Sequence, residues 1–426
     1  MNDFPTKPCA PSIPRSLRDG WEAKHSTARV PQVSYLRPGK RLTGLTALTL
    51  LALALTACGT HDFPQYPPNY REYAYITNGG SGTVTVLDVV NIRVDRELAV
   101  GRNPVAVAAS PTRNEVYVVN SGVENAQGSN QDGSVSVINA ENNTVAATIP
   151  VHRQPVSIDL AADGALAYVA NSGSNSISVL DLKTRREIAQ IGAGEQPVSA
   201  RISPDGKTLL ASNRKANSVS TLDPSTGKIR AVFESCPGAA DAVILPDSTK
   251  AFVACADGHQ VMVIALAHSK LNPGKPDRLE TFLDVGRAPV QLALKPDGGE
   301  IFVSNSLSDS ISEIYAGTDE VGGAYMIGDD PVRGLVSADN ALLYVGNLRS
   351  QWVTVYAIDD GRRIGSIHVG DGPSALAFSS NGFLLFVVDA RSADVAVVRA
   401  ASSSLFTVMP TGRAPNAIAV KAFKLP

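Results

Sequence analysis

The sequence is poor in the residues that usually build reactive or metal-binding centres. Its 426 residues include only 4 cysteines and 6 histidines, and the histidines lack the spacing of metal ligands. The haem-attachment motif Cys-x-x-Cys-His, the phosphate loop Gly-x-x-x-x-Gly-Lys and the nucleophile elbow Gly-x-Ser-x-Gly are all absent. Sequence motifs therefore predict no cofactor, no metal site and no catalytic nucleophile.

Long apolar runs are equally scarce. The one clear example is a stretch of 16 residues, Leu42 to Ala57, which follows Arg37, Lys40 and Arg41. Sixteen residues are short for a membrane span, which needs about 20, but the order of charge and apolar run is that of an export signal. The run ends in Leu-Thr-Ala followed by Cys58 and glycine, which resembles a bacterial lipobox.

These features predict a leader and lipoprotein signal peptide over residues 1–57, with a lipid on Cys58. Residues 58–71, which contain three prolines, are then the lipidated cysteine and a flexible spacer. Glycine rather than aspartate after Cys58 indicates delivery to the outer membrane, with the rest of the chain facing the periplasm or the surface. The alternative is an ordinary secretory peptide that is cleaved nearby.

A basic surface is also missing. The leader contains 8 Lys and Arg against 3 Asp and Glu, so the remaining chain has 30 basic and 37 acidic residues and a formal charge of −7. Nucleic-acid binding usually requires a strongly basic face, so this balance argues against a nucleic-acid partner.

The dominant feature is a short strand that ends in a polar residue and recurs eight times. The copies are spaced 42, 51, 42, 42, 50, 42 and 42 residues apart, and helical periodicity is absent after residue 60. A period near 42 with strand content is typical of a β-propeller, in which each repeat forms one four-stranded blade. The copies lie at 74–78, 116–120, 167–171, 209–213, 251–255, 301–305, 343–347 and 385–389.

A second motif, Gly-x-x-Pro, opens most repeats and shows how the ring closes. Its last copy, Gly412 to Pro415, has no polar-ending strand after it, whereas the first such strand, Ala74 to Asn78, has no proline strand before it. We therefore expect residues of about 415–422 to pair with strands within 72–100 in a split blade. The predicted fold is an all-β, eight-bladed propeller over 72–423; if the split blade fails to close, seven blades are the alternative.

One repeat, 194–235, gives the expected strands within a blade. They are Pro197 to Ser203, Thr208 to Asn213, Ser218 to Leu222 and Lys228 to Phe233, separated by turns rich in Asp, Pro and Gly. The asparagine that ends the second strand is expected to cap the turn that follows it.

The eight motif copies resemble the repeats of the YVTN-family β-propellers, and the resemblance covers residues 72–423. The chain departs from the pattern at Cys255 and Asp389, which replace the asparagine, and at Ala239, which replaces the proline. The family consists mostly of exported bacterial and archaeal proteins without a single shared activity. The resemblance therefore implies architecture and export more than chemistry.

Two cysteines remain in the repeat domain, and both lie in one repeat. Cys236 stands at the start of its first strand and Cys255 at the end of its second. In an oxidising periplasm we expect them to form a disulfide, which the chain-entropy model values at about 3 kcal/mol. The alternative is two buried free thiols.

The loops that lead into the first strand of each repeat, together with those between the second and third strands, are expected to form the ligand-binding mouth of the propeller. Arg413, Arg102 and Arg153 fall on three consecutive blades, and Asp329, Asp330 and Asp371 fall on the two blades before them. Arginine suits carboxylate or phosphate through its bidentate fork. These residues, with Arg287 in another such loop, form the predicted binding surface. The alternative is that they are solvated turn residues whose charges neutralise one another.

Trp352 is a further candidate on the same side. It occupies a position where other repeats have serine, and it lies near Arg349 in the sequence. It is a candidate anchor for a partner, or else a residue that fills a gap between blades.

Taken together, these observations favour a membrane-anchored, non-catalytic binding or scaffold protein of the cell envelope. Its partner would be an envelope protein or polymer that contacts the loop face. The alternative is a metal-dependent, lactonase-like hydrolase, for which Asp329, Asp330 and Asp371 are the visible candidate carboxylates. A third class, a redox propeller with a cofactor, is disfavoured because no motif would hold haem or quinone.

Overall fold

The computed structural model describes residues 64–122, 132–267 and 274–425. The predicted leader, the lipidation site Cys58 and the first part of the spacer lie outside the described residues. So do most of the expanded loop between the second and third strands of one repeat and part of the insertion near residue 270. No helix within the described ranges is long and apolar enough to cross a membrane.

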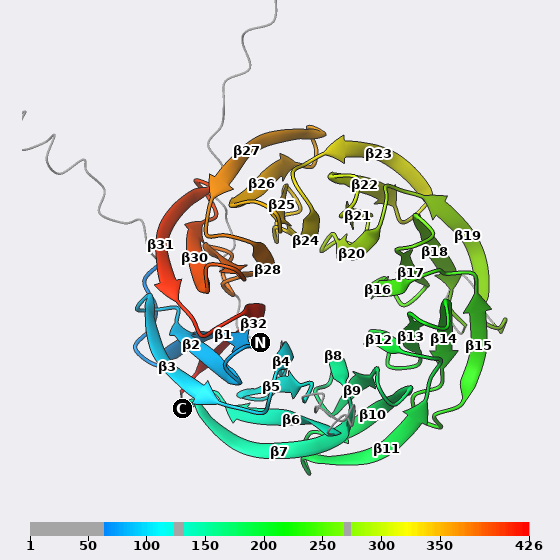
Figure 1. The fold of residues 1–426 in the computed structure, drawn as a ribbon, viewed down its shortest axis with the longest axis horizontal. Coiled ribbons are helices and arrows are strands. Elements are labelled where there is room, and N and C mark those ends of the chain that lie inside the picture. Colours follow the sequence, from blue (N-terminus) through cyan, green and yellow to red (C-terminus); the bar gives the residue numbers. More distant parts are fainter. Residues whose placement is uncertain (1–63, 123–131, 268–273, 426) are drawn as a thin grey trace, which may run out of the picture. The chain divides into compact units, whose positions relative to one another are not determined.

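The described strands form eight four-stranded antiparallel sheets, arranged as the blades of a ring (Figure 1). The prediction of eight blades is confirmed, and the seven-bladed alternative is wrong. In chain order the strands are β1 (Tyr70–Asn78), β2 (Thr83–Asp88), β3 (Arg93–Ala99), β4 (Pro104–Ala109), β5 (Glu115–Asn120), β6 (Asp132–Asn139), β7 (Thr144–Arg153), β8 (Pro155–Leu160), β9 (Leu166–Asn171), β10 (Ser176–Asp181), β11 (Arg186–Gly192), β12 (Pro197–Ile202), β13 (Leu209–Asn213), β14 (Ser218–Leu222), β15 (Ile229–Glu234), β16 (Ala239–Ile244), β17 (Lys250–Cys255), β18 (Gln260–Ala265), β19 (Arg278–Asp284), β20 (Pro289–Leu294), β21 (Glu300–Asn305), β22 (Ser310–Tyr315), β23 (Glu320–Met326), β24 (Pro331–Val336), β25 (Leu342–Asn347), β26 (Trp352–Ala357), β27 (Arg362–His368), β28 (Pro373–Phe378), β29 (Leu384–Asp389), β30 (Asp394–Arg399), β31 (Ser404–Pro410) and β32 (Pro415–Lys424).

The ring closes through the split blade that the sequence predicts. The last strand, β32, is the innermost strand of a sheet whose other members are β1, β2 and β3. It pairs antiparallel with β1 from Tyr70 opposite Lys424 to Asn78 opposite Pro415. Closure gives β1 a partner on both sides and removes an open edge.

The chain before the ring also contacts it. Tyr66 stacks on Tyr70 with ring centroids 4.8 Å apart, and its hydroxyl accepts a hydrogen bond from Asn381 at 3.0 Å. The buried carboxylate of Glu72 accepts a bond from the backbone N–H of Ser380 at 2.6 Å. Residues 66–71, expected to be spacer, thus join the split blade to its neighbour.

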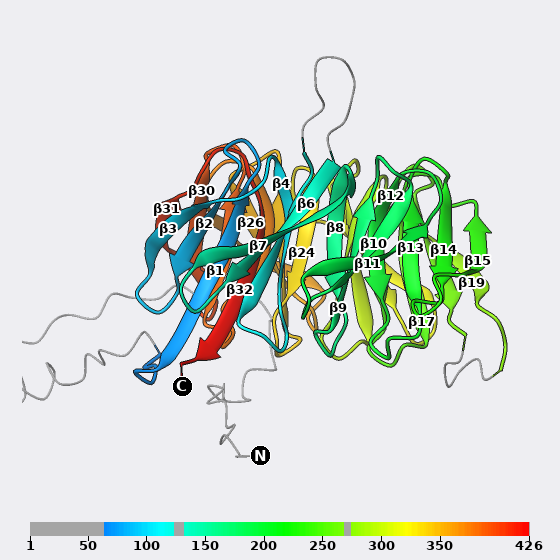
Figure 2. The same ribbon diagram turned by 90° about the horizontal axis from the view of Figure 1, so that it is seen from below.

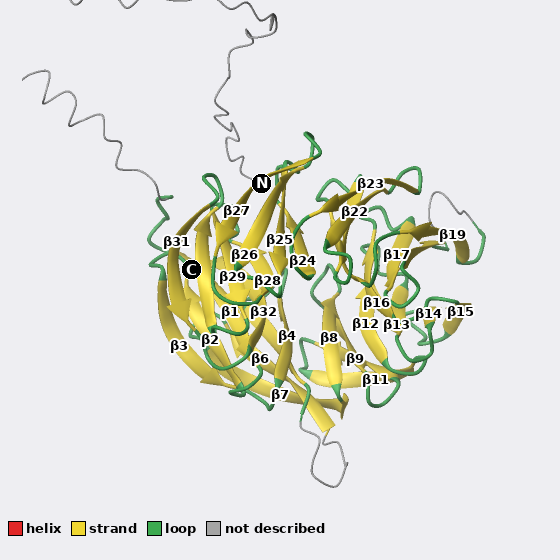
Figure 3. Cartoon of the chain, turned by 45° about the horizontal axis from the view of Figure 1, so that its top comes forward, coloured by secondary structure: helices red, strands yellow, loops and turns green. Residues whose placement is uncertain are grey.

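Apolar packing between sheets holds neighbouring blades together. The middle strands are buried on both faces, as in β5 and β6, because each blade lies between two others. Tyr117, Val119 and Val137 of one blade pack with Ile158 and Val169 of the next in one continuous cluster. The outermost strands, such as β3 and β11, are largely exposed. Figure 3 shows that the described elements are strands and loops throughout.

The recurrent asparagine caps the next turn through its backbone, since the carbonyl oxygen of Asn171 accepts from the N–H of Ser174 at 3.1 Å, and its side chain bonds the third strand of the blade. The Nδ2 of Asn213 donates to the hydroxyl of Ser220 at 3.0 Å, and Asn171 bonds Ser178 in the same way at 2.9 Å. The glycine that opens the repeat lies directly over this amide: a Cβ on Gly194 would be 2.7 Å from Asn213 Cγ. The glycine of one sequence motif and the asparagine of the other are therefore in direct contact within each such blade.

The disulfide replaces that contact in one blade. Cys236 occupies the glycine position and Cys255 the asparagine position, and the two are bonded with Cα atoms 4.8 Å apart. The predicted disulfide is therefore present. Its geometry follows from the close approach that glycine and asparagine make in the sibling blades.

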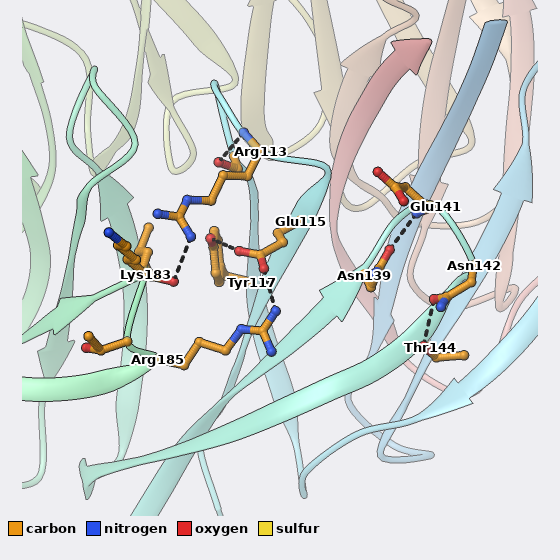
Figure 4. A network of polar contacts seen from close by, with 12 residues as sticks. Arg113, Glu115, Tyr117, Asn139, Glu141, Asn142, Thr144, Lys183 and Arg185 are labelled. Atoms are coloured by element: carbon orange, nitrogen blue, oxygen red, sulfur yellow. Dashed lines mark hydrogen bonds and ion pairs between the residues drawn. The ribbon is translucent and has the colours of Figure 1, made fainter. Parts of the chain in front are cut away.

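The two faces of the ring carry different loops (Figure 2). We call the side with the loops leading into the innermost strands the top face, and the side where β1 begins and β32 ends the bottom face. Ion pairs and hydrogen bonds also link blades near the bottom face: Glu115 accepts from Tyr117 at 2.7 Å and from Arg185 of the next blade at 2.7 Å (Figure 4).

Candidate functional site

Three arginines stand at the top face of neighbouring blades, Arg102 and Arg413 in loops and Arg153 at the end of β7. Arg413, Arg102 and Arg153 are exposed and precede β32, β4 and β8 respectively, which are adjacent innermost strands (Figure 1). No hydrogen bond or ion pair joins their guanidinium groups to any other side chain in the described part of the chain. Such a guanidinium keeps all five donors available to a partner.

The backbone of these loops is well fixed. The carbonyl oxygens of Arg413, Arg102 and Arg153 accept bonds from Gly80, Gly122 and Gly173 at 2.9, 3.1 and 3.1 Å. The loops that enter the first strand are thereby tied to those between the second and third strands. Fixed loops lower the entropic cost of ordering this surface when a partner binds.

The predicted acidic side of the mouth is largely neutralised within the protein. Asp330 pairs with Arg349 at 3.3 Å and Asp371 with Arg391 at 3.2 Å, while Asp329 is exposed. Arg287 donates to the carbonyl oxygen of Leu307 at 2.8 Å. For Asp330 and Asp371 the structure thus favours the alternative of neutralised turn residues, and the aspartates do not converge as a ligand set.

Trp352 is the first residue of β26 and is 45% exposed. Its ring meets the ring of His368 edge-on, with centroids 4.8 Å apart. Arg349 pairs with Asp330, so the tryptophan and this arginine present separate features on one blade. An exposed, laterally supported indole is a suitable anchor for a partner.

A second set of candidate residues, missed by the sequence reasoning, lies on the innermost strands. We call Asp159 (β8), Arg201 (β12), Asp241 (β16), Gln291 (β20) and Arg333 (β24) the channel cluster. Three other innermost strands, β28, β32 and β4, have only alanine at both equivalent positions: 375, 377, 417, 419, 106 and 108. The signal in the sequence was a charged or polar residue at a position where sibling repeats have alanine.

Most of the channel cluster links one blade to the next. Asp159 accepts from the backbone N–H of Ile202 at 2.9 Å, and Asp241 from that of Leu292 at 3.2 Å. Gln291 accepts from the N–H of Gly334 at 2.7 Å. These side chains bond backbone groups of the neighbouring innermost strand, which is not paired with their own strand by the sheet ladder.

The two channel arginines differ in their partners. Arg201 donates to Asp241 at 2.9 Å and to the carbonyl oxygen of Ala242 at 3.1 Å. Burial works to lower the pKa of Arg201, but Asp241 and Asp159 outweigh it and raise that pKa. Burial lowers the pKa of Arg333, and the nearby charge of Arg201 lowers it further. The carboxylate of Asp241 raises this pKa, but only enough to offset part of the decrease. Arg333 has no hydrogen bond or ion pair among the described residues.

Two adjoining cavities follow this cluster along the inside of the ring. One, of about 280 Å³, is lined by Arg201, Arg214 and Arg333 together with Ser157 and Ser199. The other, of about 320 Å³, adds Asp159 and shares Arg201, Asp241, Gln291 and Arg333 with the first. Burial raises the pKa of Asp159 despite the nearby Arg201.

The described ranges contain no group of three or more His, Cys, Asp or Glu residues close enough to hold a metal ion. The channel cluster contributes hydrogen-bond donors and one ion pair to the lining of the two cavities.

Comparisons with known proteins agree on a β-propeller, although the matching family model has seven blades and this ring has eight. The family model "Lactonase, 7-bladed beta-propeller" matches residues 110–246. The uncharacterized protein YncE of Salmonella typhi is 35% identical over 97 residues, which is 23% of this chain and 25% of that protein. The matched part thus spans about a quarter of the length of this relative.

Two solved structures share the fold at low identity. Dihydro-heme d1 dehydrogenase NirN, in complex with DHE, has a TM-score of 0.65 at 15% identity and covers 84% of this chain and 76% of its own. AztD from Citrobacter koseri, in its apo form, has a TM-score of 0.62 at 14% identity over 83% of this chain and 98% of its own. The ring of eight sheets and these similarities together identify the chain as an eight-bladed β-propeller.

Proposed function

We propose that this protein is a non-catalytic binding or scaffold propeller of the cell envelope that engages a protein or polymer through its top face. The observation that carries the proposal is the set of three exposed arginines, Arg413, Arg102 and Arg153, on adjacent blades without internal partners. Such donors suit carboxylate or phosphate groups on a macromolecule. The exposed Trp352 adds an apolar anchor on the same face.

The position of β1 supports a membrane-tethered arrangement. Residues 64–69 join β1 at the bottom face, so the chain leading towards Cys58 is attached on the side away from the arginines. A lipid on Cys58, delivered to the outer membrane, would then leave the top face free for a partner. In this proposal the leader of residues 1–57 directs export.

The test compares the full-length protein with two triple variants, each purified from membranes in detergent. In one, Arg102, Arg153 and Arg413 are replaced by alanine. In the matched control, Arg93, Arg186 and Arg362 at the starts of outer strands β3, β11 and β27 are replaced, which removes the same charge. Loss of a stoichiometric partner in the first variant alone, by at least tenfold, is expected.

Equal retention of the partner in both variants would contradict the role of the top face. The variant Cys58→Ser separates the anchor from the binding surface. It should move the protein from the membrane to the soluble fraction without loss of the partner.

A lactonase-like hydrolase is the second candidate, and the family match over residues 110–246 favours it. That match includes Asp159, Arg201 and Asp241 of the channel cluster. Elemental analysis of the purified protein, combined with a lactone hydrolysis assay, distinguishes the two. One equivalent of calcium or zinc with turnover that depends on Asp241 would favour the hydrolase.

A further inference from the structure

One residue of the channel cluster, Arg333, makes no hydrogen bond that links blades within the described structure. Asp159, Asp241 and Gln291 accept hydrogen bonds from the next innermost strand, and Arg201 donates to the strand after its own. Arg333, on β24, makes no such bond to β28. Its guanidinium lines both cavities and is partly buried.

A charged group in this position carries an electrostatic cost. Burial lowers the pKa of Arg333, and Asp241, the nearby carboxylate, already pairs with Arg201 at 2.9 Å. A partly buried cation whose neighbour is already paired is stabilised by an anion that enters the cavity. Replacement of Arg333 should therefore affect ligand binding much more than folding.

Two serines on the opposite wall of the cavity are a second, independent feature of this site. Ser157 and Ser199 line the cavity of about 280 Å³, and their hydroxyl oxygens, which have almost no accessible surface, lack a hydrogen-bond partner in the described structure. Ser199 is only 4% exposed. Buried polar groups in native proteins nearly always have partners, so an orphaned pair in one cavity points to a missing ligand or water.

The unused groups around this cavity are donors. Arg333 offers its full guanidinium, Arg214 lines the same cavity, and the two serines can donate through their hydroxyls. Asp241, the carboxylate in the lining, already accepts from Arg201 and Leu292. A ligand that satisfies this set must bring acceptors, and preferably negative charge.

We propose that this cavity is a binding site for a small anion with a carboxylate or phosphate group. Arg333 holds the anionic group through its bidentate fork, and Ser157 and Ser199 donate to its remaining oxygens. At about 280 Å³ the cavity lies at the small end of ligand pockets, which run from about 300 to 1,000 Å³, so the ligand is a small molecule. This site is separate from the top-face arginines and independent of the partner proposed for them.

The test is isothermal titration of the full-length protein, in a chloride buffer, with sodium phosphate and with sodium succinate as probes. Binding of either probe at up to millimolar concentration is expected, and the probe that binds more tightly identifies the anionic group. The variant Arg333→Gln should weaken that binding at least tenfold, and Ser199→Ala should weaken it by a smaller factor.

The matched control is Arg186→Ala, which removes one exposed arginine from the outer strand β11 and should leave probe binding unchanged. Because Arg333 has no hydrogen bond to lose and its partly buried charge is costly, Arg333→Gln should unfold at the same temperature as the parent or slightly above it, which separates lost binding from lost structure. The proposal is overturned if neither probe binds, or if the better probe binds Arg333→Gln as tightly as the parent.

Discussion

At the scale of single residues, the repeat is a contact between a glycine and a polar side chain. Asparagine donates to a hydroxyl of the third strand, and the glycine that opens the repeat leaves space for the amide. In one blade the pair becomes Cys236 and Cys255, and in another it becomes Gly370 and Asp389. Each substitution preserves the closeness of two backbone segments while changing the chemistry that joins them.

The variant Gly194→Ala tests the close approach. A Cβ there would lie 2.7 Å from Asn213 Cγ, so the variant should lose about 1–3 kcal/mol of unfolding free energy through overpacking. Gly192→Ala is the matched control, since nothing lies within 4 Å of its added Cβ. Urea denaturation measures both, and equal midpoints for the two variants would contradict the role given to the glycine.

We predict that Asp389 makes the stability of the protein depend on pH. Burial, with a further contribution from Asp394, raises the pKa of Asp389 to about 8 from its ordinary value of 3.8. The folded state therefore favours the protonated form, which confers stability that is full below about pH 4 and is lost as the pH rises through about 8. The variant Asp389→Asn should retain this stability across the whole range.

Thermal unfolding of Asp389→Asn and of the parent, followed from pH 5 to pH 9, checks this. The gain in stability of the variant should increase with pH, because only the parent must bury a charge at high pH. The exposed variant Asp360→Asn serves as the control and should follow the parent. A gain that is constant or decreases with rising pH would contradict the assignment.

At the scale of strands, local sequence predicts the elements well. The third strand of the repeat 194–235 was predicted at Ser218 to Leu222 and is β14, Ser218–Leu222. The fourth, predicted at Lys228 to Phe233, is β15, Ile229–Glu234, shifted by one residue. Turns of Asp, Pro and Gly separate short apolar strands whose pairing is local, so the sequence carries most of the information.

Removal of residues 412–426 tests the closing strand. The truncated protein loses β32, which leaves one edge of β1 unpaired, so its apparent unfolding temperature should fall sharply and its tendency to aggregate should increase. Thermal unfolding followed by circular dichroism measures this. A peptide of residues 412–426 added in excess should restore part of the loss, and unchanged stability on truncation would contradict closure through β32.

At the scale of the whole molecule, the candidate sites were only partly predictable. The exposed arginines follow from one loop motif, so their place on adjacent blades could be read from repeat order. The pairing of Asp330 with Arg349 and of Asp371 with Arg391 joins two loops of one blade, which spacing alone does not reveal. The channel cluster draws one residue from each of five blades, and only the closed ring brings them together.

The top-face arginines and the channel cluster are suited to ligands of different size. The top face presents fixed, exposed donors suited to a large partner, whereas the channel presents buried donors suited to a small anion. Residues 64–69, which lead into β1, lie at the opposite face. A propeller of this kind can hold a macromolecule and a small ligand at once, because the two sites share no residue.

The most direct test of the top-face claim is site-specific photocrosslinking in intact cells. A photoreactive amino acid is placed singly at positions 102, 153 and 352 on the top face, and at positions 93, 186 and 362 at the far ends of outer strands. We predict that the top-face positions crosslink to one and the same macromolecule and that the other positions do not. Crosslinks to that partner only from positions 93, 186 and 362, or none from the top face, would contradict the proposed function.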